Sequence, residues 1–391
     1  MGFRWLPLMV LAVVVLLTAL FLLPKRKAAE HGRVVSVTEA LGGEPEGGFA
    51  RAAAPRRFTF PADHGPHPGF RTEWWYFTGN LKTVKGQRFG YQLTFFRVAL
   101  KPGPVARSSR WGANEVFMAH FAVTDVAGKR FYYAERFSRA ALGLAGAGGN
   151  PLAVFLEDWS ARETMTNPWS MQLAARDGDV AVDFRVRSIM PPVLNGEDGL
   201  SRKGRKPGNA SYYYSIPRME TSGTIRIGAE SFSVSGLTWL DREWSTSALE
   251  VDQVGWDWFA LQLDDGRSLM FYQLRRSDGT ADPFSSGTLV ATGGNSRHLV
   301  REEVQLSIND WWTSPVSGSR YPSRWRLRVP IEGLDLEIVP RLADQELLAS
   351  VRYWEGAVAV RGISAGSPGG SGYLEMTGYG VTEKKRQELR P

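Results

Sequence analysis

The sequence predicts an all-β protein with two domains, preceded by an N-terminal transmembrane or signal segment. The chain has 391 residues, which is too long for one ordinary hydrophobic core. Aromatic residues make up 12% of it and 42 glycines are spread along it, a mixture typical of broad, twisted sheets rather than helix bundles. Strand and turn patterns recur after residue 58, and helical periodicity extends beyond a turn or two only around 343–351.

Residues 1–27 form the membrane-directed segment. Leu6–Leu23 carries no charge and is nearly long enough to cross a bilayer at about 1.5 Å per residue. No clear small-residue cleavage site follows before "KRKAAE", which favours an uncleaved anchor over a removed signal peptide. Lys25, Arg26 and Lys27 come next, and the positive-inside rule alone would place this cluster in the cytoplasm.

The rest of the chain divides into a tether and two strand-rich halves. Residues 28–57 are rich in Gly, Ala, Glu and Pro without a sustained apolar period, which predicts a flexible linker. Aromatic strands joined by tight turns predict hairpins at 72–100, 115–138 and 255–276. Since a barrel of about eight strands removes sheet edges and can enclose one small ligand, we expect a pair of barrels. We assign these two domains to 58–240 and 241–391.

The charge of the chain gives little indication of its partner. A formal net charge of +7 is compatible with an anionic partner. The arginines are nevertheless scattered among strand residues, and the globular part has neither a long basic run nor a nucleic-acid-binding motif. We therefore expect a solvated basic surface and no nucleic-acid partner.

Several kinds of site have no support in the sequence. Cysteine is absent, which excludes a disulfide framework, a thiolate nucleophile and a Cys-based zinc site. The nucleophile elbow, the phosphate-binding loop, the dinucleotide fingerprint and the H-E-x-x-H motif are also missing. His64 and His67 stand in a segment broken by Gly65, Pro66 and Pro68, which predicts a structured loop rather than a metal site. We expect no metal and no cofactor.

Glu73 stands in "RTEWWYFTGNL", directly before two tryptophans and a tyrosine. Strand alternation places it on the more apolar face, with Trp75 and Phe77. Two interpretations are open. Loss of solvation would raise the pKa of Glu73 and make it a proton donor near neutral pH. Alternatively, Glu73 pairs with Arg71 or Arg97 and only fixes the end of the strand.

Further acids stand among aromatic residues in the second half of the chain. Asp241 and Glu243 lie two residues apart between tryptophans in "TWLDREW". Asp257 shares a predicted strand face with apolar residues, and Glu355 follows a tyrosine and a tryptophan. Each of these acids is either a working group or a structural partner of an arginine. His120, in "MAHFAVTD", is either a hydrogen-bonded core residue or a direct participant.

Six blocks of the chain, in this order, resemble the CrtC/AttH-type lipocalin-like family: "FPADHGPHPGFRTEWWYFTGNL", "SGLTWLDREWSTSAL", "GWDWFALQLDDGRSLMFYQLR", "YPSRWRLRVP", "QELLASVRYWEGAVAV" and "GSGYLEMTGYG". The resemblance covers about Phe58 to Tyr379. That family includes carotenoid 1,2-hydratase (hydroxyneurosporene synthase) and bacterial secreted hydrolases. The resemblance implies two lipocalin-like β-barrel domains in tandem. For the secreted-hydrolase branch it also implies export across the inner membrane, often beside an ABC transporter of the lipoprotein-exporting type.

For the hydratase branch, the resemblance implies addition of water to an isolated alkene without a cofactor. This chemistry requires an acid, aromatic faces that stabilise a carbocation and a positioned water. The sequence departs from that branch at Arg242, because the branch carries a histidine after the aspartate of the matching turn. Arginine does not exchange protons at ordinary pH, so the acid role would fall to Glu243.

On this basis we predict Glu243 as a proton donor and Asp241 as its partner. Asp257 and Glu73 are predicted to tune pKa values or position water, and His120 is a further predicted catalytic residue. The predicted ligand-binding residues are all aromatic: Trp74, Tyr76, Trp244, Trp256, Trp258, Tyr272 and Tyr353.

Two functions are compatible with these features. The protein is either a cofactor-independent hydratase, cyclase or hydrolase acting on an apolar lipid or isoprenoid, or a non-catalytic lipid-binding module that works with an ABC transporter. An unpaired carboxylate at the floor of a pocket favours the enzyme, whereas acids that are all paired with arginine favour the binding module. In both cases we expect an inner-membrane anchor with the globular part in the periplasm, or secretion.

Overall fold

Two antiparallel sheets dominate the computed structural model, which describes residues 47–103, 109–247 and 249–380. The first sheet has 13 strands and the second has 10, and both belong to one compact unit. Within the described residues, helix is limited to three single turns of 3-10 type: η1 (Ala62–His64), η2 (Arg301–Glu303) and η3 (Pro330–Glu332). The predicted all-β class is therefore confirmed.

The first sheet contains every strand up to residue 245. Its strands are β1 (Thr72–Lys82), β2 (Arg88–Ala99), β3 (Glu115–Asp125), β4 (Arg130–Arg139), β5 (Ala145–Gly149), β6 (Leu152–Leu156), β7 (Trp159–Thr166), β8 (Trp169–Asp177), β9 (Val180–Ser188), β10 (Val193–Leu194), β11 (Leu200–Arg202), β12 (Ala210–Ile227) and β13 (Glu230–Ser245). They pair in the order β4-β3-β2-β1-β13-β12-β9-β8-β7-β6-β5, and β10 and β11 pair with β12.

The second sheet begins at residue 253. Its strands are β14 (Gln253–Leu263), β15 (Ser268–Arg276), β16 (Ser286–Val290), β17 (Ser296–Val300), β18 (Gln305–Thr313), β19 (Arg320–Val329), β20 (Leu334–Pro340), β21 (Glu346–Leu348), β22 (Arg352–Gly362) and β23 (Gly370–Met376). They pair in the order β17-β16-β15-β14-β23-β22-β20-β19-β18, and β21 pairs with β22. The chain thus changes sheet between Ser245 and Gln253.

The three predicted hairpins are present as the antiparallel pairs β1–β2, β3–β4 and β14–β15. The helical stretch considered around 343–351 is absent, because that segment forms β21 against β22. The side chain of Gln345 accepts a hydrogen bond from the backbone N–H of Ala357 at 2.9 Å and donates to its carbonyl at 3.2 Å. Pairing with a neighbouring strand therefore replaces the local helical hydrogen bonds.

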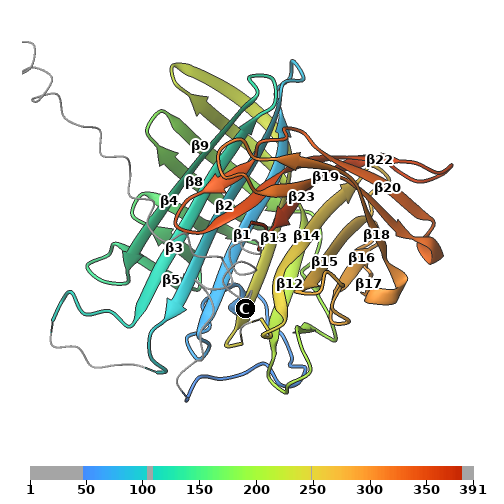
Figure 1. Ribbon diagram of the computed structural model, residues 1–391. Helices are drawn as coiled ribbons and strands as arrows, with labels where there is room; N and C mark the ends of the chain where they lie inside the picture. Colours follow the sequence, from blue (N-terminus) through green and yellow to red (C-terminus); the bar gives the residue numbers. More distant parts are fainter. Residues whose placement is uncertain (1–46, 104–108, 248, 381–391) are drawn as a thin grey trace, which may run out of the picture. The chain divides into compact units, whose positions relative to one another are not determined.

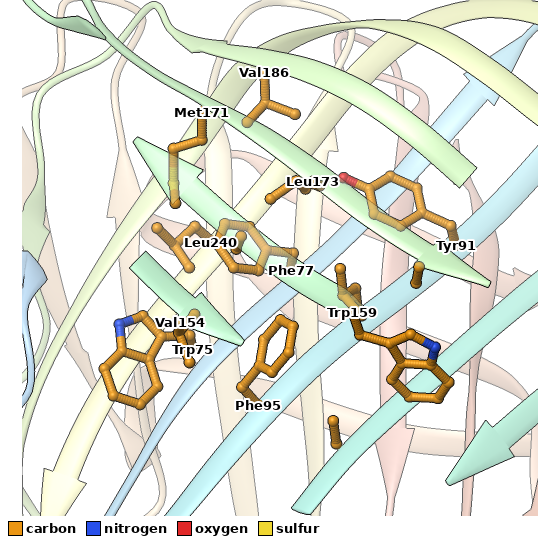
Figure 2. Packing of buried hydrophobic residues seen from close by; sticks show 14 of the residues in the cluster. Trp75, Phe77, Tyr91, Phe95, Val154, Trp159, Met171, Leu173, Val186 and Leu240 are labelled. Atoms are coloured by element: carbon orange, nitrogen blue, oxygen red, sulfur yellow. The ribbon is translucent and has the colours of Figure 1, made fainter. Parts of the chain in front are cut away.

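Each sheet curls around its own apolar core (Figure 1). The first sheet is a nearly closed barrel and the second is a half-barrel, which matches the predicted tandem of lipocalin-like domains. Figure 2 shows Trp75, Phe77, Phe95 and Trp159 packed together inside the first barrel. Side chains fill this interior, so the first barrel differs from the ligand-enclosing barrel that we expected.

Strand alternation divides the residues of β1 between two environments. Trp75 and Phe77 belong to the core of the first barrel. Trp74 and Tyr76, on the opposite face, belong to clusters that include residues of the second sheet. There β22 and β23 cross over β2 and β1 (Figure 1). The outer face of β1 therefore lies against the second sheet, and the functional site lies on this face.

The predicted membrane-directed segment 1–27 and the linker up to residue 46 lie outside the described residues. In the part of the chain that the structure describes, no helix combines the length and the apolar character required to cross a membrane.

Candidate functional site

A cavity of about 150 Å³ lies between the two sheets. The first domain lines it with Thr72, Trp74, Tyr76, Phe96, Lys203, Ser211, Tyr213, Asp241, Glu243 and Ser245. The second sheet lines it with Trp256, Trp258, Tyr272, Leu274, Tyr353 and Glu375. Aromatic residues are the largest group in this wall and carboxyl groups lie on both sides, a composition typical of a small-molecule site.

Strand register brings the acids of the first sheet beside its aromatic residues. Glu243 of β13 is directly opposite Trp74 of β1 and Tyr213 of β12. Two residues earlier on β13, Asp241 is directly opposite Tyr76 of β1. Because alternate residues of a strand share a face, Asp241 and Glu243 both point towards the second sheet.

The facing sheet contributes a second row of acids. Glu375 of β23 is directly opposite Trp258 of β14 on one side and Glu355 of β22 on the other. Glu355 and Glu375 are therefore neighbours on one face, where two charged carboxylates would repel each other.

In the described part of the chain, the hydrogen-bond donors to Asp241 are all neutral. Ser215 Oγ lies 2.5 Å from Oδ1 and Trp239 Nε1 lies 2.6 Å from it, while the Tyr213 hydroxyl donates to Oδ2. Burial raises the pKa of Asp241 to about 7, and the charge of Glu243 adds to the rise against these hydrogen bonds. Asp241 is therefore close to half protonated near neutral pH.

Glu355 and Glu375 also have no positively charged partner among residues 47–103, 109–247 and 249–380. Trp256 Nε1 donates to Glu375 Oε1 at 2.9 Å, and the Tyr76 hydroxyl donates to Glu355 Oε1. Burial, together with the charges of Asp241 and Glu243, raises the pKa of Glu375 to about 8. Burial and the charge of Glu375 hold the pKa of Glu355 well above its usual range. This pair of carboxyl groups retains protons at neutral pH.

Glu243 has a cationic neighbour. Lys203 Nζ lies 3.4 Å from Glu243 Oε1 and 3.8 Å from the centroid of the Tyr272 ring. Although burial acts to lower the pKa of Lys203, its interactions with Glu243 and Tyr272 together raise this pKa above its usual value. Ser211 Oγ also donates to Glu243. Within one pocket, Glu243 is thus ion-paired, whereas Asp241 and Glu375 form no ion pair with any residue that the structure describes.

Glu73 lies on the other face of β1, outside the pocket. Its carboxylate is 2.5 Å from Arg97 Nε and 3.0 Å from Arg242 Nη2. Although burial acts to raise the pKa of Glu73, hydrogen bonding from His67 and the charges of both arginines bring it below its usual range. This arrangement agrees with the ion-pair interpretation of Glu73, with Arg97 as one partner.

Arg242 is directed away from the pocket, although both neighbours on its strand line the pocket. Its guanidinium donates to the carbonyl oxygens of Trp74 at 2.7 Å and Gly65 at 2.6 Å, besides Glu73. It also lies over the Trp75 ring, 4.0 Å from its centroid. Arg242 therefore binds the loop before β1 to the first barrel and does not contact the acids of the cavity.

Three other predicted site residues lie outside the cavity lining. Asp257 faces the second core, 3.3 Å from Arg275 Nε and 2.9 Å from the Tyr379 hydroxyl. Trp244 packs inside the first barrel. His120 lies behind the cavity wall, where its Nδ1 is 2.6 Å from the Tyr353 hydroxyl and its ring centroid is 5.5 Å from that of Phe96.

The structure therefore brings together eight of the twelve predicted residues: Asp241, Glu243, Trp74, Tyr76, Trp256, Trp258, Tyr272 and Tyr353. Sequence reasoning missed Glu375, although it lies in the block "GSGYLEMTGYG", where alternation places it on the face of Tyr373. It also missed Lys203, which follows the short strand β11 in a Gly-rich segment without a motif.

The two histidines of the segment before β1 are engaged by protein groups. His64 Nδ1 lies 2.6 Å from the Tyr214 hydroxyl, and His67 contacts Asp63 at 3.2 Å and Glu73 at 3.3 Å. Among residues 47–103, 109–247 and 249–380, no group of three or more acidic or histidine side chains is arranged to hold a metal ion.

The fold and the cavity define a lipocalin-like protein with tandem β-barrel domains and an aromatic, carboxyl-rich pocket between them. The chain belongs to the AttH-like family, whose model matches residues 51–379. The crystal structure of an AttH-designated protein from Nitrosomonas europaea is 34% identical, with a TM-score of 0.76, and the match covers 85% of this chain and 100% of that one. The predicted resemblance is therefore confirmed for the AttH-like family.

Kievitone hydratase is a more distant relative. The protein from Fusarium solani subsp. phaseoli is 22% identical over 227 residues, a match that spans 56% of this chain but less than two thirds, 61%, of that protein. The crystal structure of kievitone hydratase from Nectria haematococca is 15% identical, with a TM-score of 0.64 over 86% of this chain and 97% of that one. At this identity, the structural likeness supports the fold alone.

Proposed function

We propose that this protein is a hydratase-type enzyme that protonates a carbon–carbon double bond of an apolar ligand held between the two sheets. One observation carries the proposal: Glu375, a cavity-lining carboxyl group whose pKa is raised to about 8, lies among tryptophans and has no arginine partner among the described residues. A carboxyl group that stays protonated at neutral pH is the donor that alkene hydration requires.

The proposed reaction balances with water as the only second reactant. The Glu375 proton moves to the less substituted alkene carbon, and the π electrons form the new C–H bond. The resulting tertiary carbocation lies among Trp74, Trp256 and Trp258, whose ring faces attract positive charge. The oxygen of a water then bonds to the cation, and a carboxylate on the first-sheet side takes the water proton. The product is a tertiary alcohol.

Within this proposal the roles of the acids differ from those expected from the sequence. Glu243, first assigned as donor, already forms an ion pair with Lys203 and is better suited to orient the water or accept its proton. Glu375 takes the donor role. Asp241, whose pKa is about 7, can hold or release a proton near neutral pH. It can therefore pass a proton between Glu243 and Glu375.

The size of the cavity favours action on the end of a molecule rather than storage of a whole lipid. A volume of about 150 Å³ is comparable to an apolar cavity that holds one benzene ring. We therefore propose a substrate with a small branched alkene at one end, such as an isoprenoid or a prenyl substituent. The name kievitone hydratase, carried by a relative of the same fold, supports addition of water as the reaction class.

A non-catalytic lipid-binding module that works with an ABC transporter is the alternative function. Export, with an anchor in the inner membrane and the globular part in the periplasm, or secretion, is likewise a proposal. It is supported by the uncharged stretch 6–23 and by the secreted-hydrolase branch that the sequence resembles.

The test incubates the purified protein with a set of prenylated phenols and linear isoprenoid alkenes in ¹⁸O-labelled water. Mass spectrometry should detect addition of one labelled water by the wild type. Because general acid catalysis contributes about 10²- to 10⁴-fold, Glu375→Gln should lose activity by that factor. Glu346→Gln is the matched control, since Glu346 is buried and bonded to Tyr321 at 2.8 Å but does not line the cavity.

Recovery of unchanged probe from wild type and Glu375→Gln, with native mass spectrometry showing that both bind it, would support the lipid-binding module instead. An equal loss of turnover in Glu346→Gln would show that the substitution acts through stability and not through proton donation.

A further inference from the structure

Behind the cavity wall, a chain of polar groups runs from the outer part of the first sheet towards the acids of the second. Glu135 of β4 is directly opposite His120 of β3. His120 is fully buried, whereas the side chain of Glu135 is 13% exposed. Tyr353 of β22 reaches His120 from the second sheet and also lines the cavity. The chain therefore has one end near solvent and the other at the pocket.

The distances along this chain are those of hydrogen bonds. His120 Nε2 lies 2.9 Å from Glu135 Oε1, and His120 Nδ1 lies 2.6 Å from the Tyr353 hydroxyl. Since a carboxylate can only accept a hydrogen bond, Nε2 carries the ring proton. Nδ1 then has a free lone pair and accepts a hydrogen bond from the Tyr353 hydroxyl. Gln92 Nε2 donates to the Tyr353 oxygen at 3.1 Å and holds it in place.

The inner end of the chain is the protonated carboxyl group of Glu355. Tyr353 and Glu355 lie two residues apart on one face of β22, and Tyr353 is close enough to favour the charged form of Glu355. Glu355 Oε1 accepts from Tyr76, while Glu355 Oε2 is buried without a hydrogen-bond partner in the described part of the chain. Because Oε1 accepts from Tyr76, the proton of this carboxyl group lies on Oε2, a buried donor that has no fixed acceptor among the described residues and lies on the same strand face as Tyr353.

We propose that Glu135, His120 and Tyr353 form a proton-transfer path that exchanges the protons of the Glu355/Glu375 carboxyl pair with solvent. The Glu355 proton moves to the Tyr353 oxygen while the Tyr353 hydroxyl proton moves to His120 Nδ1 and the Nε2 proton moves to Glu135, which releases it to solvent. The reverse sequence starts with a solvent proton on Glu135 and returns one proton to Glu355 and the ring proton to Nε2. Each proton that leaves is thus replaced by one that enters. In this scheme His120 and Glu135 act through Tyr353 and do not contact the ligand.

The outer end is built to accept and release protons. The Ser350 N–H and hydroxyl donate to Glu135 at 3.0 Å and 2.8 Å. Although burial acts to raise the pKa of Glu135, hydrogen bonds from His120 and Ser350 hold it below its usual value. Glu135 is therefore a carboxylate that binds a proton only briefly, which suits an entry point. The use of this path in turnover rests on the proposed acid chemistry, whereas the path itself can be measured without a substrate.

The experiment follows proton exchange of the buried acids in the full-length protein without a ligand. Infrared spectroscopy after transfer from H₂O to D₂O at pH 7 records the shift of the carboxylic acid C=O band, which Glu355→Gln and Glu375→Gln assign. We expect His120→Gln and Glu135→Gln to slow this shift by about tenfold or more, because each removes a proton-carrying group. His64→Gln is the matched control, since His64 makes a comparable buried contact of 2.6 Å with Tyr214 inside the first barrel.

Exchange at the wild-type rate in both His120→Gln and Glu135→Gln would overturn the path, and so would equal slowing in His64→Gln. Glu135→Gln keeps the test open if His120→Gln does not fold, because Glu135 is not fully buried. The two proposals fail separately: unchanged alkene probe with slowed exchange in the variants contradicts the hydratase function alone, and hydration with unaffected exchange contradicts the path alone.

Discussion

Two groups of carboxyl groups lie on opposite sides of β1 and differ in their hydrogen-bonding and ion-pair partners. On the inner face, Glu73 is fully buried and contacts Arg97 and Arg242. On the outer face, across the cavity, Glu375 and Glu355 accept hydrogen bonds from Trp256 and Tyr76. The pKa is lowered in the first group and raised in the second. Burial alone therefore does not decide the protonation of these acids; the charge of their partners does.

This difference separates a bracing role from a chemical role. A carboxylate between two arginines is charged at every ordinary pH and has no proton to give. A carboxyl group surrounded by indole and phenol donors keeps its proton until the pH approaches its raised pKa. The comparison can be tested by removing the charge from each group in turn.

The largest loss of stability is expected for Glu73→Gln, which leaves the buried Arg242 without a counter-charge among the described residues and leaves Arg97 with the partly exposed Glu115. Removing one partner of a buried ion pair costs about 3–5 kcal/mol in free energy of unfolding, which denaturant titration would measure. Because the folded pKa of Glu73 is lowered, its contribution is present above its ordinary pKa of 4.5 and is lost as the pH falls below that value.

The control is Glu115→Gln, because Glu115 contacts Arg97 at 2.9 Å with a side chain that is 30% exposed. A loss of no more than about 1 kcal/mol is expected there. Equal losses in the two variants would contradict the bracing role assigned to Glu73.

The second expected effect concerns the pH dependence of stability around Glu375. Since its folded pKa is raised to about 8 from 4.5, the folded state holds more protons between these values, and stability falls as the pH rises through this window. One such group contributes a slope of about 1.4 kcal/mol for each pH unit. Unfolding free energies at a series of pH values should therefore show a shallower fall for Glu375→Gln than for the wild type.

A slope that does not change in Glu375→Gln would mean that Glu375 is ionised in the folded protein. Glu355→Gln provides the comparison, because two interacting carboxyl groups titrate as a pair and either substitution should alter the same part of the curve.

The smallest effect is expected at Asp257. In its number of arginine partners, this residue is intermediate between Glu73 and Glu375. It has one arginine partner, Arg275, whose side chain is 17% exposed, and it accepts from Tyr379 at 2.9 Å. In Asp257→Asn the arginine can still be solvated in part, so we expect a loss of about 1–3 kcal/mol by thermal or denaturant unfolding. Glu220→Gln, at an ion pair with both side chains more than half exposed, should lose less than about 1 kcal/mol.

A loss at Asp257 as large as that at Glu73 would show that the number of arginine partners does not govern these carboxylates. Burial would then be the remaining explanation, since Glu73 and Asp257 are both fully buried whereas Glu375 is partly buried.

Much of the site was predictable because β-strands have a fixed period. Alternation placed Trp74 and Tyr76 on one face of their strand and Glu73 on the other, and the structure shows the same division. Asp241 and Glu243 were recognisable as acids set among aromatic residues. Lys203 could not be found in this way, because a residue in an irregular segment has no periodicity that indicates where it points.

The sequence by itself determined the all-β class, the main hairpins and the family, because these depend on local periodicity, turn residues and ordered blocks along the chain. The tertiary structure decided which face carries the site. It packed the first barrel with side chains and brought Glu375 opposite Glu355 and across from Asp241. It also decided which acids are paired with arginine, since the partners of Glu73 come from β2 and β13, and strand register alone brings them together.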